Sequence, residues 1–406
     1  MWPDTLRLST PPAVSARESE PAPALQSRAL PGMAAIDRAG WTAALPRDAE
    51  GWAYLAACEA GPPPGMELRA VAVRDPRGFA AGAPLFALNY RLDTPLQGGP
   101  LERVCNALAR RLPRLLEWRM LGVGSPFTEH CPVAVHPRLT QGERETALAA
   151  LIGEVEAEAV RRGAGLVAFK DISAARAPGL TEALAARRYF PVESLPLAVL
   201  DLAEYPDAES YLAGLSKSTR KDLRRKMKGA GSVTVSQHCA ITGMEHEFAA
   251  LYAETQAQSA LRYNAFEDLP ADYFQWVSQT LKERAIFVCY RVNGVLAAFN
   301  LLFVEHDRVI DKFLGMRYPL AREHDLYAIS WMYNVRLCQS IGRRYLQTGQ
   351  TAYASKLRFG SGLVPSVHYV KHRNPLLHGA LRQAAPMLAF PRWDPDLKTH
   401  RARAAA

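Results

Sequence analysis

The sequence predicts a mixed α/β protein made of two similar domains, each with a mostly antiparallel sheet flanked by helices. At 406 residues and 49% apolar content, the chain is too long for one ordinary hydrophobic core. Each half shows alternating apolar segments typical of hairpin strands, then a segment with helical periodicity, an Arg-Arg pair and a short strand. We interpret this repeat as a divergent duplication, the alternative being two ordinary α/β units that are alike by chance.

The expected domain boundaries follow from composition. Residues 1–45 are rich in Pro, Ala and Ser with little periodicity, which predicts a disordered leader. The two domains are expected over 46–205 and 206–374. Residues 375–406 combine apolar and aromatic side chains with terminal cations, which predicts an amphipathic basic tail. Such a tail suits contact with an anionic membrane, and packing on the protein's own core is the alternative.

Strands and helices of the first half can be placed from their patterns. Residues 66–73 and 79–92 alternate around Asp75-Pro76-Arg77-Gly78, which predicts a hairpin. Apolar residues at helical spacing between 148 and 159 predict an amphipathic helix that ends at Gly163. A strand over 166–169 follows.

The second half repeats that order. Residues 285–291 and 295–304 flank Asn293-Gly294, a strong hairpin signal, and 308–316 supply a third strand. A helix over about 326–341 and a strand over 345–348 complete the unit.

Residues 216–228 form the most charged segment, with seven cations against one carboxylate. Apolar residues every three or four positions predict a helix, with Thr219 or Ser218 as its N-cap. Lys217 and Arg220 then lie near the helix start, where cations oppose the helix dipole unless an anion such as phosphate binds there. The alternative is a solvated basic face.

Composition narrows the partners and the compartment. A formal charge of +9 and a pI near 9.3 favour acidic partners such as nucleotides, CoA, tRNA or an anionic membrane surface. The six cysteines are far apart and have no metal-binding spacing, so we expect reduced thiols and no metal site. No apolar run is long enough for a membrane span. We expect a cytoplasmic protein, peripheral at most at the inner membrane face.

Three segments carry a family resemblance: 211–225, which contains Leu-Ser-Lys-Ser-Thr-Arg-Lys-Asp-Leu-Arg-Arg, then 311–315, and 349–356 with its Tyr-Ala-Ser-Lys. Over about residues 50–370 the chain resembles the tandem GNAT-fold transferases, and most of all the FemAB-like group and its relatives in cell-envelope and exopolysaccharide biosynthesis. The resemblance implies transfer of an acyl or aminoacyl group to an amine. It also implies acyl-CoA or an acyl-carrier protein as co-substrate and no permanently bound cofactor.

The resemblance also suggests residues for the donor and acceptor. It implies phosphate-facing side chains on the basic helix, namely Lys217, Arg220, Lys221 and Arg224. It implies that Tyr353 and Lys356 line the acceptor or phosphate end of the cleft. The glycine-rich pyrophosphate loop of single-domain GNAT enzymes is absent, and the matching segment offers Arg317 and Arg322 instead. Phosphate binding would then use side chains more than backbone amides.

Candidate bases lie in both halves, since acyl transfer needs a group that accepts the proton of the attacking amine. In the first half, Glu129 and His130 stand in an unusual polar turn, where capping of a local element is the alternative. In the second half, every second side chain of a strand lies on the same face, which places Asp311 with Val309 and Phe313. Asp311 would then be a partly buried carboxylate with a raised pKa. The alternative is a charge pair on an edge strand. Weaker candidates are Tyr327, Asn300 and, as a nucleophile, Cys131.

These inferences favour an N-acyltransferase that moves an acyl group from a CoA or carrier-protein thioester to a primary amine on a lipid, amino sugar or peptide precursor. Two alternatives remain open at this stage. One is an aminoacyl-tRNA-dependent transferase of the FemAB kind, and the other is a non-catalytic scaffold that binds a polyanion.

Overall fold

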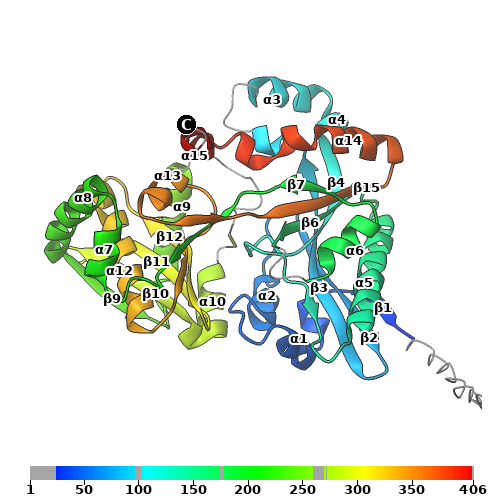
Figure 1. Cartoon of the computed structure of the whole chain (residues 1–406), viewed down its shortest axis with the longest axis horizontal. Coiled ribbons are helices and arrows are strands. Elements are labelled where there is room, and N and C mark those ends of the chain that lie inside the picture. The colour runs from blue at the N-terminus through cyan, green and yellow to red at the C-terminus, as the bar shows by residue number, and fades with distance from the viewer. Residues whose placement is uncertain (1–23, 97–101, 174–177, 259–268, 271, 405–406) are drawn as a thin grey trace, which may run out of the picture.

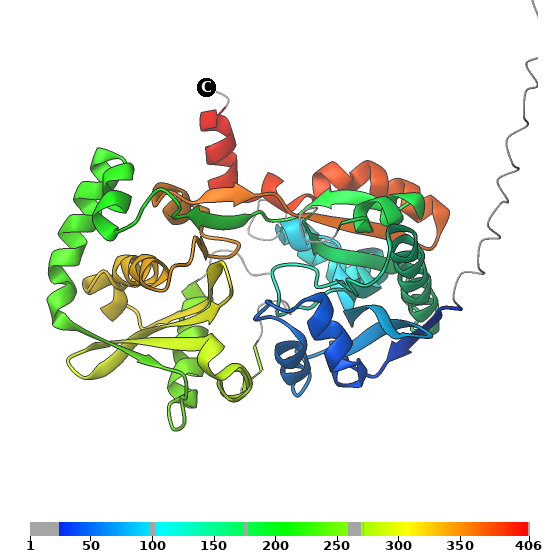
Figure 2. The same cartoon turned by 60° about the horizontal axis from the view of Figure 1, so that its bottom comes forward.

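A computed structural model describes residues 24–96, 102–173, 178–258, 269–270 and 272–404. The chain forms two halves side by side, each built on one mixed sheet with helices on its faces (Figures 1 and 2). The strands of the first half are β1 Gln26–Leu30, β2 Glu67–Asp75, β3 Gly78–Arg91, β4 Glu117–Val123, β5 Ala134–Val135, β6 Leu166–Ile172 and β7 Phe190–Glu193. Its helices are α1 Arg38–Ala44, α2 Trp52–Cys58, α3 Glu102–Arg111, α4 Pro113–Leu116, α5 Gln141–Arg161 and α6 Leu180–Ala186.

The second half follows the same plan, as the duplication hypothesis requires. The first half of the chain ends with β8 Leu197–Asp201, and the strands of the second half are β9 Val233–His238, β10 Ala285–Val292, β11 Val295–Val304, β12 Arg308–Met316, β13 Tyr345–Gln347, β14 Gly362–Val364 and β15 Val367–His372. Its helices are α7 Ala208–Gly214, α8 Lys217–Lys228, α9 Glu245–Gln258, α10 Tyr273–Leu281, α11 Leu320–Glu323, α12 Leu326–Ser340, α13 Tyr353–Arg358, α14 Pro375–Leu388 and α15 Pro395–Ala404.

The two sheets exchange strands. The first sheet has the order β1-β2-β3-β4-β6-β15-β7, and the second, read from its other edge, has β9-β10-β11-β12-β13-β8-β14. Each sheet therefore takes its next-to-last strand from the other half of the chain. Segments 190–201 and 362–372 cross between the halves side by side (Figures 1 and 2). The predicted domain boundaries near 205 and 374 therefore do not separate the two sheets, because β8 lies before the first boundary but joins the second sheet, and β15 lies before the second but joins the first sheet.

The predicted hairpins are present where the turn residues place them. Asn293 and Gly294 both have positive φ, 50° and 82°, as a two-residue hairpin turn requires, and they join β10 to β11. Gly78, with φ 113°, begins β3 after the turn that follows β2. The amphipathic helix of the first half is α5, which Thr140 and Glu143 cap reciprocally.

The predicted leader is wrong for its second part. Residues 1–23 lie outside the described residues, but β1 pairs antiparallel with β2, from Gln26 opposite Arg74 to Leu30 opposite Ala70. Asp37 then caps α1 through a hydrogen bond from the Ala39 N–H. Trp41 is fully buried in the core that α1 and α2 share with the second half. The ordered first domain thus begins about twenty residues earlier than composition indicates.

The basic helix and the tail also differ in detail from expectation. Ser216, rather than Ser218 or Thr219, is the N-cap of α8 and accepts a hydrogen bond from the Thr219 N–H. In the tail, α14 packs against β7 and β15 of the first sheet and buries Leu381, while Leu376 is 83% exposed. Within the described residues, every helix is too short or too polar to cross a membrane.

A bulge in β12 changes the predicted pattern of faces. The register shifts so that Leu301 faces Phe313 and Leu302 faces Asp311, which leaves Lys312 as an extra residue. Val309 consequently packs in the core beneath α12, whereas Phe313 packs on the opposite face against α9 and α10. The expectation that Val309 and Phe313 share a face is therefore wrong. Because β12 lies between β11 and β13, Asp311 is not on an edge strand either.

The exchanged strand β15 should contribute strongly to the stability of the first half. Val370 lies opposite both Ala168 and Phe190, so Val370→Pro removes a backbone donor in the middle of a sheet. We expect a loss of about 2 to 4 kcal/mol in the free energy of unfolding, measured by urea denaturation. Val364→Pro on the edge strand β14 is the matched control and should cost clearly less. Equal losses for the two variants would contradict a structural role for the exchange.

Candidate active site

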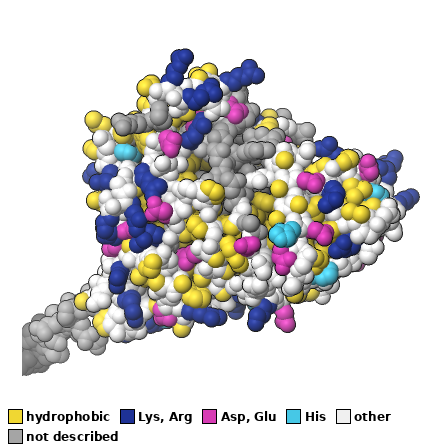
Figure 3. All heavy atoms as spheres, turned by 180° about the vertical axis from the view of Figure 1, so that it is seen from behind, with side chains coloured by type: hydrophobic (Ala, Val, Ile, Leu, Met, Phe, Trp, Pro, Cys, Tyr) yellow, Lys and Arg dark blue, Asp and Glu magenta, His cyan; other side chains and the backbone are white. Residues whose placement is uncertain are grey.

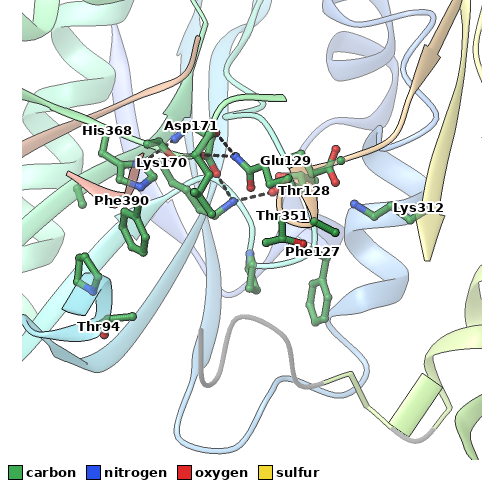
Figure 4. Close-up of a pocket in the computed structure, with 18 of the residues that line it drawn as sticks. Thr94, Phe127, Thr128, Glu129, Lys170, Asp171, Lys312, Thr351, His368 and Phe390 are labelled. Carbon is green, nitrogen blue, oxygen red and sulfur yellow. Dashed lines mark hydrogen bonds and ion pairs between the residues drawn. The ribbon is translucent and has the colours of Figure 1, made fainter. Parts of the chain in front are cut away.

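A cavity of about 470 Å³ lies where the two halves meet. It borders the points at which parallel strands separate. In the second half β12 pairs with β13 only over Arg308–Ile310, and in the first half β4 pairs with β6 only over Met120–Val123. The side chains beyond these points reach into the cavity from both halves (Figure 4). Its polar lining includes Thr128, Glu129, Lys170, Asp171, Ser194, Asp311, Lys312, Tyr327, Gln350, Lys356 and His368.

Asp311 is held by two amides from buried positions. The Asn300 Nδ2 donates to Asp311 Oδ1 at 2.8 Å, and the Asn334 Nδ2 donates to Oδ2 at 3.1 Å. Asn300 and Asn334 are 0% and 1% exposed, so the amides cannot turn to water. Burial raises the pKa of Asp311 to about 6, and the charge of Glu129 acts in the same direction. The carboxyl group can therefore take up and release a proton near neutral pH.

Glu129 enters the cavity from the first half and meets the segment after β13. Its Oε2 accepts a hydrogen bond of 2.8 Å from Gln347 Nε2. Gly349 has φ 78°, and a Cβ at this position would lie 2.6 Å from Glu129 Oε1. Glycine is needed at 349 both for the backbone conformation and for this close approach between the halves.

Lys356 on α13 supplies a cation on the same wall. It is 7% exposed, and burial lowers its pKa to about 8, although the charges of Glu129 and Asp311 oppose that change. Its Nζ donates to the Gln350 carbonyl oxygen at 3.4 Å. Below about pH 8 the cavity thus contains a buried ammonium beside two carboxyl groups.

The two predicted tyrosines differ in their placement. Tyr327, at the start of α12, lines the cavity, and burial raises its pKa, which keeps the phenol protonated at neutral pH. Tyr353 is fully buried, and its hydroxyl donates to the Pro196 carbonyl oxygen at 2.7 Å. Tyr353 therefore joins α13 to the exchanged segment and does not line the cavity.

His130 is also placed outside the cavity lining. It belongs to a buried ion cluster, with Nδ1 at 3.3 Å from Glu50 and Nε2 at 3.7 Å from Asp48. Glu50 also pairs with Lys312 Nζ at 2.5 Å. Burial alone would raise the pKa of Glu50, but Lys312 and His130 outweigh it and lower the pKa to about 2. We correct the prediction of His130 as a base, because these contacts make it part of a link between the halves.

Helix α8 lies on the outer side of the second half (Figure 1), and none of its residues lines the cavity. Lys217, Lys221 and Arg224 are exposed, and Arg224 pairs with Glu209 at 2.7 Å. The Arg220 guanidinium donates to the Ala213 carbonyl oxygen. On the face drawn in Figure 3, Lys and Arg side chains are spread widely, with acidic ones among them. The structure thus separates this part of the predicted site from the candidate bases.

The other end of α8 approaches the segment that replaces the glycine-rich loop. Lys226 pairs with Asp325, the N-cap residue of α12, at 3.4 Å. Arg322 is exposed and lies over the Tyr318 ring at 5.0 Å. Arg317 is partly buried just after β12. These cations gather near the start of α12, where the helix has no side-chain cap.

A second polar group in the first half escaped the sequence analysis. Asp171 has φ 52° and accepts hydrogen bonds from Ser194 Oγ at 2.5 Å and Lys170 Nζ at 2.5 Å. Its backbone N–H donates to His368 Nδ1 at 3.0 Å. Burial lowers the pKa of His368, and Lys170 and His368 hold the pKa of Asp171 down despite its burial. In the sequence, this group could have been indicated only by the Lys-Asp pair directly after the predicted apolar strand 166–169. Its partners Ser194 and His368 come from distant segments.

Two other chemistries find little support in the described residues. Burial raises the pKa of the Cys131 thiol to about 12, so it is not an activated nucleophile. No group of three or more His, Cys, Asp or Glu side chains in the described ranges is arranged to hold a metal ion.

Comparisons with known proteins agree with this architecture. Residues 217–356 match the family model of the acetyltransferase (GNAT) domain. No curated protein matches the chain. The crystal structure of FemX is similar at 12% identity and TM-score 0.50, covering 79% of this chain and 91% of that one. At such low identity this likeness concerns the fold.

Two further solved structures give lower TM-scores. A tandem GNAT protein from the clavulanic acid biosynthesis pathway is 13% identical with TM-score 0.49, covering 87% of this chain and 99% of that one. The C-terminal domain of a putative lysylphosphatidylglycerol synthetase from Agrobacterium fabrum is 13% identical with TM-score 0.48, covering 86% and 94%. The family match argues for an enzyme over a polyanion-binding scaffold. Residues 217–356 match the acetyltransferase (GNAT) domain, and the protein is an acyltransferase.

Proposed function

We propose that the protein is an N-acyltransferase that moves an acyl group from a CoA or carrier-protein thioester to a primary amine on a lipid, amino sugar or peptide precursor. The observation that carries this proposal is Asp311, a carboxyl group with a pKa of about 6 that faces a cavity at the separation of β12 and β13. A base of this pKa is suited to remove a proton from an ammonium group at neutral pH.

The proposed reaction uses residues on the cavity wall. Asp311 accepts the proton of the attacking amine, the amine nitrogen bonds to the thioester carbonyl carbon, and the carbon–sulfur bond then breaks. Lys356 is near enough to both carboxyl groups for their charges to act on its pKa, so it can stabilise the negative charge of the carbonyl oxygen. The proton that Asp311 accepted can then pass to the leaving thiolate, and the Tyr327 hydroxyl, which stays protonated, can donate a hydrogen bond in the cavity. Glu129 contributes negative charge that attracts a cationic amine.

We place the phosphates of the donor near the start of α12. Lys226 contacts Asp325 at a helix terminus that lacks a side-chain cap, and Arg317 and Arg322 belong to the segment just before it. Side-chain cations there can take the role of the missing glycine-rich loop. The exposed cations of α8 favour a second candidate, in which an aminoacyl-tRNA is the donor and its backbone extends along the outer surface.

Replacing Asp311 should separate activity from stability. In Asp311→Asn, turnover should fall about 100- to 10,000-fold because the base is lost. Since folding raises the pKa of this acid, its ionised form destabilises the fold at high pH, and the variant should gain about 1 to 3 kcal/mol at pH 8. The gain should vanish near pH 4, where Asp311 is protonated in the folded protein. The new amide can be accommodated because Oδ1 of Asn300 and of Asn334 lacks a partner.

Turnover and urea denaturation at pH 4 and 8 measure these effects. Asp272→Asn, at an exposed position before α10, is the control and should change both quantities little. An Asp311→Asn protein with full turnover would contradict the assignment of the base.

The dependence of kcat/KM on pH should be bell-shaped. Activity should rise as Asp311 loses its proton near pH 6 and fall as Lys356 loses its proton near pH 8. Lys356→Met should reduce activity at pH 7 and remove the alkaline limb, while the acid limb stays. An alkaline limb unchanged in this variant would show that Lys356 does not act as the cation.

Salt dependence should identify the donor. If the donor is a thioester, acetyl-CoA at 100 times its Kd should stabilise the protein by about 2.7 kcal/mol, and thermal unfolding should show this at both 50 and 200 mM salt. A charged-tRNA pool serves as the comparison, since tRNA contacts weaken about 1,000-fold or more over that range. Stabilisation by tRNA alone, lost at 200 mM salt, would favour the aminoacyl-tRNA alternative.

A further inference from the structure

The cavity continues from its polar centre into an arm with apolar walls. This apolar arm lies between the first sheet and α14, and it is lined by Phe86, Met120, Ala168, Phe190, Val370 and Leu388 among others. Apart from Leu388, which is the last residue of α14, these residues come from five neighbouring strands, β3, β4, β6, β15 and β7. At about 4.8 Å per strand spacing, five strands span about 19 Å. The arm is therefore long relative to an acetyl group.

Polarity changes along a single face of the first sheet. Val370 lies opposite both Ala168 and Phe190, which gives an apolar row across three strands. Two residues further along β6 stands Lys170, and two before Val370 on β15 stands His368. Both polar side chains line the cavity. The face thus begins with charged and hydrogen-bonding groups and continues as hydrocarbon. In Figure 4, Thr94 and Phe390 lie at one end of the cavity, Lys312 at the other, and Lys170 between them.

The same face is incompletely filled by the protein's own side chains. Its cluster contains eight buried apolar residues, while several neighbours such as Tyr90, Ala168 and Val370 are only partly buried. The opposite face, under α5, is packed with many more fully buried side chains. An apolar cavity of this kind does not hold water well and gains by taking up an apolar ligand.

We propose that the apolar arm binds a linear hydrocarbon chain of the substrate, with the reacting group held at the polar centre near Asp311. The proposal rests on the proposed acyl transfer and specifies its substrate class as a long-chain amphiphile. Such a chain can belong to a fatty acyl thioester or to a lipid amine. In either case the polar end faces Lys170, His368 and the base, and the hydrocarbon lies beneath α14.

Two ligand series test the proposal and distinguish the two sources. Dissociation constants are measured by isothermal titration for acetyl-, octanoyl- and lauroyl-CoA, and for butyl-, octyl- and dodecylamine below their micelle concentrations. One series should bind about fourfold more tightly per added methylene, as expected for CH₂ groups removed from water. If affinity rises with chain length in the CoA series, the arm binds the donor. If it rises in the amine series, the arm binds the acceptor.

Variants locate the chain. Ala168→Phe places a ring in the arm and should remove the dependence on chain length, and the smaller change Ala168→Leu should reduce it if the first variant does not fold. Ala157→Phe on α5, which covers the opposite face, is the matched control and should keep the wild-type dependence. The proposal is overturned if neither series depends on chain length in the wild type, or if both Ala168 variants retain the full dependence.

These outcomes also separate the proposal from the catalytic assignment. Tighter binding of long chains that Ala168→Phe removes, without any transfer to an amine, would keep the apolar arm and reject the proposed function. Transfer of an acetyl group that depends on Asp311, without any effect of chain length on binding, would keep the function and reject the hydrocarbon site.

Discussion

The reciprocal exchange of β8 and β15 is the constraint on which the rest of the structure depends. Each sheet places a strand from the other half between two of its own, so neither half can complete its sheet alone. The exchange fixes the separation of the halves and brings Glu129 against Gly349. The buried link between Glu50 and Lys312 reinforces it. The cavity is consequently a property of the whole chain, although the family match covers only residues 217–356.

Two carboxyl groups near this junction, the fully buried Glu50 and the partly buried Asp311, have opposite electrostatics. Glu50 pairs with Lys312 and His130, which stabilise its ionised form and lower its pKa to about 2. Asp311 is held by the neutral amides of Asn300 and Asn334, which offset burial only in part, so its pKa is raised to about 6. The first arrangement suits a structural link and the second a group that exchanges protons.

Local signals predicted much of the fold. The turn at Asn293-Gly294 and the periodicity of α5 and α12 depend on neighbours in sequence, and the structure confirms those elements. The strand exchange could not be predicted in this way, because apolar alternation in Leu197–Asp201 or Val367–His372 does not specify which sheet the strand joins. The bulge at Lys312 was missed for a related reason, since register depends on the partner strand.

The candidate site was predictable to a similar extent. Asp311 interrupts an apolar strand and Asn300 stands inside another, so both could be singled out as buried polar groups. His130 was misplaced because a polar turn does not reveal that Glu50, far away in sequence, will bind it. The group formed by Lys170, Asp171, Ser194 and His368 required three distant segments to meet. A site assembled from distant segments in this way can be identified only in the three-dimensional structure.

Asp311 is assigned here as a proton-exchanging carboxyl group at the junction of the halves. The most direct test of this assignment is an NMR titration of the side-chain carboxyl carbons in protein labelled with ¹³C-aspartate, with the Asp311→Asn protein used to assign the resonance. The resonance of Asp311 should titrate with a midpoint near pH 6. A midpoint at or below pH 4, the range of an ordinary aspartate, would contradict the assignment.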